Sequence, residues 1–418
     1  MTETHLKKSR LGWLGVLLLA IGFVEFVFLY LLKDQDALTS SVYTYYQHNY
    51  YVHLSKGELP WIDFQIEYPP LAAYALIFPA LFSGLSVFWV SYLRGLSTLA
   101  LSILTLKFLR KCDRITPQIQ DIASIAFGSM ACIVPGFYFG LFDWTLAISN
   151  VLMALLLFGR TNQPKDTKQF WPLVFGGAAI KLMPLLAIPF LIQVKALREK
   201  SNFWLSMSVA TLIHVPFVVF GFANFKAFVV YHKMRSIDCF STYACILNAM
   251  EQLGLASVVR SWKFGALEVE GSYSSIFAKA SLPLFILILI GLIAVTNRLM
   301  KRGFGVNAAF GMYLVAFLVY PAISKVSQSN YCIWTVSCLI CFWLIGFQRK
   351  RFVQFTGLAV VAILIIGFVQ DRYFVDFTLP LVPWFLIIVS TIRQILTVVL
   401  AVFCYREVLG TKLQESPG

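Results

Sequence analysis

One segment of the chain, residues 60–71, concentrates side chains suited to proton transfer. It reads PWIDFQIEYPPL, and Asp63 and Glu67 lie four residues apart, so one helical turn would bring both carboxylates to the same face. The prolines that follow favour an extended backbone before the next apolar stretch. Carboxylates held in this way could act as a general base. On charge alone, a solvated acidic loop with interfacial aromatic residues at Trp61 and Tyr68 is the simpler interpretation.

A second chemical feature is a lysine inside an apolar run. Lys181 stands in AAIKLMPLLAIP, far from either end of that run. A lysine at mid-membrane costs about 3 kcal/mol on insertion scales, so we expect Lys181 to face a wet cavity and to have a partner. A structural lysine that extends to the membrane surface is the alternative, and we favour a functional role. Two further cations could meet an anion on the same side, Arg94 and Lys325.

The composition is that of a membrane protein. Of the 418 residues, 59% are hydrophobic and 13% are charged, about half the charged fraction of a soluble chain. Apolar stretches recur from Leu11 to Cys404, and each reaches or approaches the roughly 20 residues that cross a hydrocarbon core. Barrel strands would alternate in polarity, so these uniform runs indicate helices. We predict an all-α, polytopic transmembrane helical bundle that forms one membrane domain over residues 1–418.

The basic residues predict the topology. Residues 7–10 place the N-terminus in the cytoplasm, but the basic cluster at 107–114 would lie outside if every apolar stretch crossed. The conflict disappears if residues 68–84 form a re-entrant helix and residues 170–194 form a buried hairpin of two half-helices. Both segments contain prolines, and broken helices occur at membrane depth where they line a cavity.

With these two exceptions, both termini are cytoplasmic, and loops 33–67 and 223–275 are extracytoplasmic. The net charge of +14 then follows from basic cytoplasmic loops, without a nucleic-acid partner. We expect the plasma membrane of a bacterium. The predicted full crossings lie near 11–32, 88–109, 119–139, 143–159, 203–222, 276–296, 306–322, 331–347, 352–370 and 381–404.

Several classes of site are missing from the sequence. It contains no GxGxxG, GxxxxGK[ST] or HExxH motif, which argues against Rossmann and P-loop nucleotide sites. The eight cysteines lack metal-ligand spacing, and we interpret Cys239 and Cys245 as free thiols. We predict no bound metal and no organic cofactor, although a divalent cation would be compatible with the chemistry.

Three segments, in chain order, resemble glycosyltransferase family 87 of the GT-C superfamily. They are GELPWIDFQIEYPPL, FGGAAIKLMPLLAIP and SKVSQSNYCIW, within a resemblance that spans roughly residues 20–345. The stretch FDWTLAISNVLMALLLFGR fits a middle helix of the family more loosely. The resemblance implies a GT-C-like fold and transfer of a hexose, mannose or a related sugar, from a polyprenyl-phosphate donor at the extracytoplasmic face. The acceptor would be a lipid or a glycan.

The resemblance also implies roles for single residues. The family uses a carboxylate of the first outer loop as the base, usually an aspartate soon after the first span, but residues 39–47 contain no acid. Asp63, Asp36 and Glu67 are therefore the candidates, in that order, for an inverting single displacement. Lys181, Arg94 and Lys325 would bind the donor phosphate. Further candidate contacts to substrate, which could equally be helix-end or turn residues, are Tyr68, Asp143, Ser327, Gln328 and Tyr331.

Two other interpretations stay open. A multi-span transporter or flippase of lipid-linked or small solutes would also explain intramembrane charges and broken helices. Against it, the two halves of the chain show no convincing repeat, which many transporters have. A non-catalytic partner of another membrane transferase is the third possibility, since the usual aspartate is missing. Membrane lipids surround the chain in every case.

Cysteine labelling tests the predicted topology. We expect residues 195–200 to be cytoplasmic and loops 33–67 and 223–275 to share the opposite side. An Arg198→Cys variant should therefore resist a membrane-impermeant maleimide in intact cells and react after permeabilisation. Labelling of that position from outside would contradict the hairpin and the position of the outer loops together.

Overall fold

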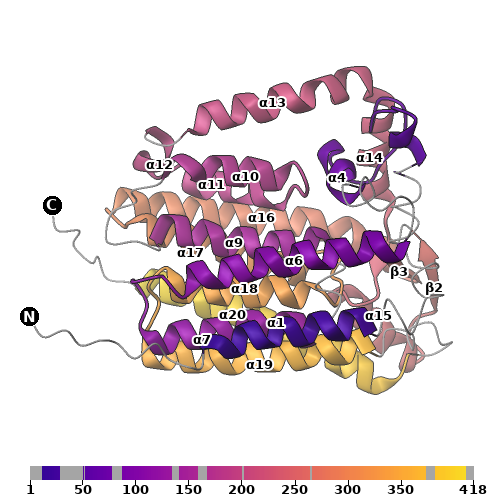
Figure 1. Cartoon of the computed structure of the whole chain (residues 1–418). Helices are drawn as coiled ribbons and strands as arrows, with labels where there is room; N and C mark the ends of the chain where they lie inside the picture. Colours follow the sequence, from indigo (N-terminus) through magenta and orange to yellow (C-terminus); the bar gives the residue numbers. More distant parts are fainter. Residues whose placement is uncertain are drawn as a thin grey trace, which may run out of the picture.

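The computed structural model shows a bundle of helices that run side by side, with a smaller group of elements at one end (Figure 1). It describes residues 12–28, 50, 52–77, 87–133, 141–158, 167–199, 202–263, 266–372 and 382–410. The start of α1 (Gly12–Phe26) and the end of α20 (Trp384–Gly410) lie at the same end of the bundle (Figure 1). We call the opposite end, which carries the smaller elements, the outer end.

Six helices in the described ranges are long and apolar enough to cross a membrane, which confirms a helical membrane protein. They are α6 (Val87–Leu109), α13 (Phe203–Phe220), α16 (Ser274–Lys301), α17 (Val306–Ile323), α19 (Lys350–Arg372) and α20. Shorter apolar helices occupy three more of the predicted crossings: α1, α9 (Leu141–Phe158) and α18 (Tyr331–Leu344). Helix α7 (Pro117–Ile133) falls in the remaining one, and its first turns carry Gln118, Gln120 and Asp121.

The bundle is packed around α17 and α18, where most side chains are buried, including Trp334 and Tyr313. At its edge, α1 lies against α7 at very short range. A Cβ atom on Gly15 would overlap the carbonyl of Ser124, and one on Gly128 would overlap the carbonyl of Gly15. Small residues that let two backbones approach this closely are typical of helix packing in membranes.

The segment 170–194 contains two short helical arms. Its first arm is α10 (Phe170–Ala178), preceded by η2 (Thr167–Gln169), and its second is η3 (Met183–Ala187) followed by α11 (Ile188–Leu191). The indole of Trp171 donates a 2.8 Å hydrogen bond to the carbonyl of Leu197 in α12 (Lys195–Glu199). The chain therefore returns beside its starting point, and Lys181 lies in the turn between the arms.

The outer end is built from both outer loops. Of the predicted re-entrant segment, α4 covers Pro70–Ile77, and residues 78–84 lie outside the described residues. Loop 223–275 forms α14 (Phe222–Met234), α15 (Thr242–Gln252) and three strands. The strands β1 (Ile237–Asp238), β2 (Val258–Lys263) and β3 (Ala266–Gly271) make an antiparallel sheet in the order β1-β3-β2. This sheet departs from the expected all-α architecture. Leu267 and Val269 alternate with glutamates and bury one face of β3.

Arg393 ties the outer elements to the bundle. From within α20, its guanidinium donates to the carbonyls of Phe240, Ser327 and Gln328 at 2.8–3.0 Å, and also to the Ser327 hydroxyl. Gln394 adds bonds to Phe240 and Ser327. The turn between α17 and α18 is thereby joined to the turn after β1. The buried charge of Arg393 is therefore satisfied chiefly by backbone carbonyls.

Replacement of Arg393 should therefore destabilise the whole outer end. Arg393→Met would leave three buried carbonyls without their charged donor, at about 1–3 kcal/mol for each group left unsatisfied. We expect a lower apparent melting temperature in detergent, measured by intrinsic fluorescence. Arg406→Met, at an exposed position of the same helix, is the matched control. Equal melting temperatures for the two variants would show that the contacts of Arg393 contribute nothing to stability.

Candidate functional site

Ionisable and aromatic side chains from distant parts of the chain meet at the outer end. They come from the loop before α4, the turn of the 170–194 hairpin, α14 with the residues after it, β3, and the start of α18 with the turn before it. We call this group the outer cluster, and it comprises Glu67, Lys181, Tyr231, His232, Arg235, Glu268, Lys325, Tyr331 and Trp334.

Helix α14 is the support on which the first outer loop rests. The indole of Trp61 packs on Phe225 and Phe228, with ring centroids 5.3 and 5.1 Å away. The side-chain amide of Asn224 donates a 2.9 Å hydrogen bond to the Trp61 carbonyl. A Cβ atom on Gly221 would overlap that carbonyl, so glycine allows the close approach of loop and helix. These contacts fix the loop six residues before Glu67.

Glu67 is held by two successive residues of α14. The hydroxyl of Tyr231 hydrogen-bonds the Glu67 carboxyl group, and the imidazole of His232 hydrogen-bonds the Glu67 backbone. Burial raises the pKa of Glu67 to about 7, against the opposing effects of the Tyr231 hydrogen bond and the charge of Arg235. A carboxyl group with this pKa exchanges its proton near neutral pH, as a general base requires.

His232 is an ionisable member of the outer cluster that stays uncharged. Desolvation by the surrounding side chains, followed by the positive charge of Arg235, lowers the pKa of His232 to about 4, although part of its surface remains exposed. Lys325 and Lys181 act in the same direction. The imidazole therefore stays uncharged at neutral pH, where it can hydrogen-bond the Glu67 backbone without adding a further cation.

Three cations act electrostatically on His232, and one of them, Arg235, also acts on the Glu67 carboxyl group. Lys181 lies over the rings of Trp334 and Tyr331, with its ammonium 4.7 and 5.7 Å from their centroids. Lys325 donates hydrogen bonds to the carbonyls of Lys233, at 3.1 Å, and Arg235. Burial lowers the pKa of Lys325. The third cation, the Arg235 guanidinium, acts electrostatically on Glu67 and Tyr331.

The structure brings together some of the predicted site residues. Glu67, Lys181, Lys325 and Tyr331 belong to the outer cluster, and Tyr68 lies near Tyr231. Asp63, ranked first as the base, is exposed, and its carboxylate accepts a 2.7 Å hydrogen bond from the Leu59 amide in its own loop. That contact is a local turn interaction.

The other predicted residues lie elsewhere. Ser327 is fully buried, and its hydroxyl accepts from Arg393 and Gln394, while the Gln328 carbonyl accepts from Arg393. Both therefore have structural contacts. Arg94 is buried within α6. Asp36 lies outside the described residues, and Asp143 lies in the first turn of α9 with its side chain outside them.

Sequence reasoning missed the α14 side of the outer cluster. Tyr231, His232 and Arg235 stand in YHKMRSID, a polar end to an otherwise apolar helix, and Glu268 lies in the β3 alternation. Their types were visible in the sequence. Their meeting with Glu67 depends on α14 lying against the first loop, about 160 residues earlier in the chain.

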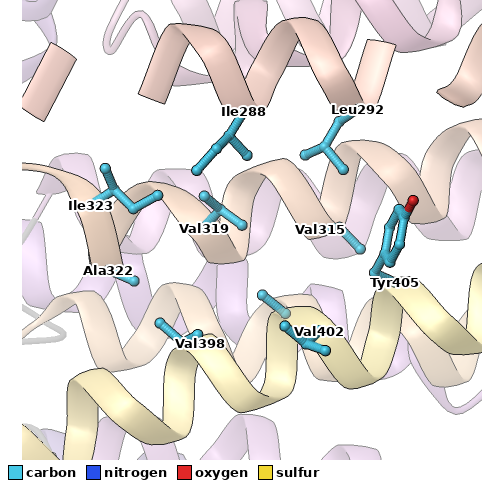
Figure 2. Close-up of a pocket in the computed structure, with 10 residues that line it drawn as sticks. Ile288, Leu292, Val315, Val319, Ala322, Ile323, Val398, Val402 and Tyr405 are labelled. Carbon is cyan, nitrogen blue, oxygen red and sulfur yellow. The ribbon is translucent and has the colours of Figure 1, made fainter. Parts of the chain in front are cut away.

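A separate feature is an apolar groove of about 280 Å³ between α16, α17 and α20 (Figure 2). Ile288, Val319 and Val402 are typical of its lining, which also includes Tyr405. Apart from Tyr405, every side chain of this lining is a hydrocarbon, so the groove suits an apolar ligand. Within the described ranges, no group of three or more His, Cys, Asp or Glu side chains is placed to hold a metal ion.

No protein-family model, curated protein or solved structure matches this chain.

The raised pKa of Glu67 makes stability depend on pH. The unfolded chain should show the ordinary value of 4.5, and the folded value is about 7. The protonated form thus favours folding, and this stabilisation is complete below about pH 4.5 and lost as the pH rises through about 7. Glu67→Gln cannot ionise, so its melting temperature relative to the unmodified protein should rise by a few degrees between about pH 5 and pH 8.

Tyr231→Phe provides the internal check. Its missing hydroxyl removes a hydrogen bond that favours the carboxylate, so the pH at which stability changes should move upward. A Glu67→Gln difference that is the same at every pH would contradict the raised pKa.

Proposed function

We propose that the protein is a membrane glycosyltransferase. It would move a hexose, mannose or a related sugar, from a polyprenyl-phosphate donor to a lipid or glycan acceptor at the extracytoplasmic face, with inversion. The observation that carries this proposal is the outer cluster, where a carboxyl group with a pKa of about 7 interacts with Arg235 and shares the cluster with two lysines, at one end of a bundle of long apolar helices.

Glu67 is the base in this proposal. Its carboxylate takes the proton of the acceptor hydroxyl while the acceptor oxygen attacks the anomeric carbon of the sugar. The bond between that carbon and the phosphate oxygen breaks, and the electron pair leaves with polyprenyl phosphate. General-base assistance contributes about 10²–10⁴-fold to such steps. Asp63 is less suited, because its carboxylate is exposed and bonded to its own loop.

The positive charges of the outer cluster suit the leaving group. Negative charge develops on the phosphate as the glycosidic bond breaks, and preorganised cations stabilise it there. The ammonium of Lys181 rests on two aromatic rings in a hairpin turn, which limits its freedom before the donor binds. The resemblance to family 87 supports the same arrangement, since two of its three segments contribute Glu67 and Lys181 and the third contributes Lys325 and Tyr331.

Release of polyprenyl phosphate from polyprenyl-phosphate mannose tests the proposal. The protein would be assayed in nanodiscs of bacterial total lipid, which also supply lipid acceptors. We expect Glu67→Gln to reduce the rate by about 10²–10⁴-fold, and the wild-type rate to rise with pH through about 7 as Glu67 loses its proton. Lys181→Met should weaken donor binding, because it removes a cation.

Two matched variants make the result specific. Glu58→Gln removes another carboxylate of the same loop, one that pairs with His53, and should leave the rate close to that of wild type. Asp63→Asn should do the same. Loss of activity in Asp63→Asn together with a normal Glu67→Gln rate would transfer the role of base to Asp63. No turnover by the wild-type protein with mannose or related donors would refute the glycosyltransferase.

A further inference from the structure

One terminal nitrogen of Arg235, a member of the outer cluster, is buried without a hydrogen-bond partner among the described residues. The residue directly follows α14, and its side chain is only 12% exposed. Its one ion-pair contact runs from Nε to Glu268 at 3.5 Å, well beyond the 2.7–2.9 Å of a strong charge-assisted bond. An arginine committed to this glutamate would offer it two parallel N–H groups, whereas here Nη2 is buried without a hydrogen-bond partner among the described residues.

Two buried donors in this region have no hydrogen-bond partner among the described residues. One is Nη2 of Arg235, and the other is the indole nitrogen of Trp334. Buried polar groups in folded proteins are nearly always paired, and each exception calls for a ligand, a water or a functional explanation. Both donors are N–H groups, so the missing partner is an acceptor.

Tyr331 connects the two donors to Lys181. Its ring stacks on Trp334 at a centroid distance of 3.7 Å, and Lys181 lies over both rings. Arg235 interacts electrostatically with the same tyrosine. Two cations thus lie close to one aromatic pair, and the indole N–H of that pair is a further donor. This combination suits a compact anion with several oxygens.

Lys325 has a different position. Its ammonium donates to the carbonyls of Lys233 and Arg235, so two of its three donors already have partners. It fixes the backbone of Arg235 at the end of α14. Although the sequence singled out Lys325 as an anion ligand, its contacts are those of a residue that positions Arg235.

We propose that Arg235 and Lys181 bind the phosphate group of a phospho-lipid substrate, with the Trp334 indole as a further donor. The inference rests on the proposed function, in which that phosphate belongs to the donor and to the leaving polyprenyl phosphate. The planar fork of Arg235 contacts two phosphate oxygens, and Lys181 contacts the group from the hairpin turn. Arg235 lies outside all three segments that carry the family resemblance.

Binding of farnesyl phosphate to the full-length protein in detergent tests this site, with farnesol and inorganic phosphate as probes that lack one half of the molecule. We expect farnesyl phosphate to bind more tightly than either. Arg235→Met should weaken binding by about 10- to 100-fold, since charge-assisted bonds are lost. Arg235→Lys should fall between, and Trp334→Phe, which keeps a ring and loses the N–H, should weaken binding several-fold. Lys233→Met, at an exposed neighbouring position, should bind like wild type.

Each contrary result has one meaning. Wild-type affinity in Arg235→Met, or in Arg235→Lys if the Met variant fails to fold, overturns the role of Arg235. Farnesol that binds as tightly as farnesyl phosphate overturns the phosphate site. Inorganic phosphate that binds as tightly would show a site for free phosphate and overturn the lipid substrate. If farnesyl phosphate binds through Arg235 but the protein turns over no polyprenyl-phosphate sugar, the proposed function fails and the phosphate site stands.

Discussion

The contacts of Arg393 are the constraint on which the outer end depends. A guanidinium buried inside a transmembrane helix has to find acceptors, and here it finds them on backbone carbonyls of two turns. One of these turns leads into α18 with Tyr331 and Trp334, and the other follows β1, which is paired with the Glu268 strand. A single buried guanidinium thereby joins the two turns that lead to these parts of the outer cluster. The free-energy cost of burying its charge is offset only when both turns supply their carbonyls, so we expect the two turns to form together.

The outer cluster combines several features that have a local cost in stability. Glu67 is buried deeply enough to raise its pKa, Arg235 keeps buried N–H groups without partners among the described residues, and the neutral His232 lies beside three cations. None of these features would be selected for stability alone. They are held by ordinary packing around them, chiefly the Trp61 contacts with α14 and the aromatic stack on α18. Buried ionisable groups that are held by well-packed surroundings are typical of functional sites.

Much of the membrane architecture could be predicted from the sequence, because hydrocarbon imposes a minimum length and a uniform composition on each crossing helix. The cost of a lysine at membrane depth likewise singled out Lys181. The order of the candidate bases could not be settled in this way, since Asp63 and Glu67 differ in burial and partners and not in type. The small sheet was detectable in the alternation of Leu267 and Val269, but its weak signal stood among much stronger apolar runs. The place of Arg235 in the outer cluster could not be predicted, because it depends on the tertiary contact between α14 and the first loop.

The position of α13 has a consequence for the membrane around the protein. This helix lies at the periphery of the bundle (Figure 1), and side chains such as Leu212 and Phe220 are largely exposed along it. It continues through Gly221 directly into α14, which holds Glu67 by both its carboxyl group and its backbone. A helix bordered mainly by lipid adjusts its tilt to the thickness of the bilayer. In the enzyme proposed above, bilayer thickness would therefore influence the position of the Glu67 carboxyl group relative to the membrane surface.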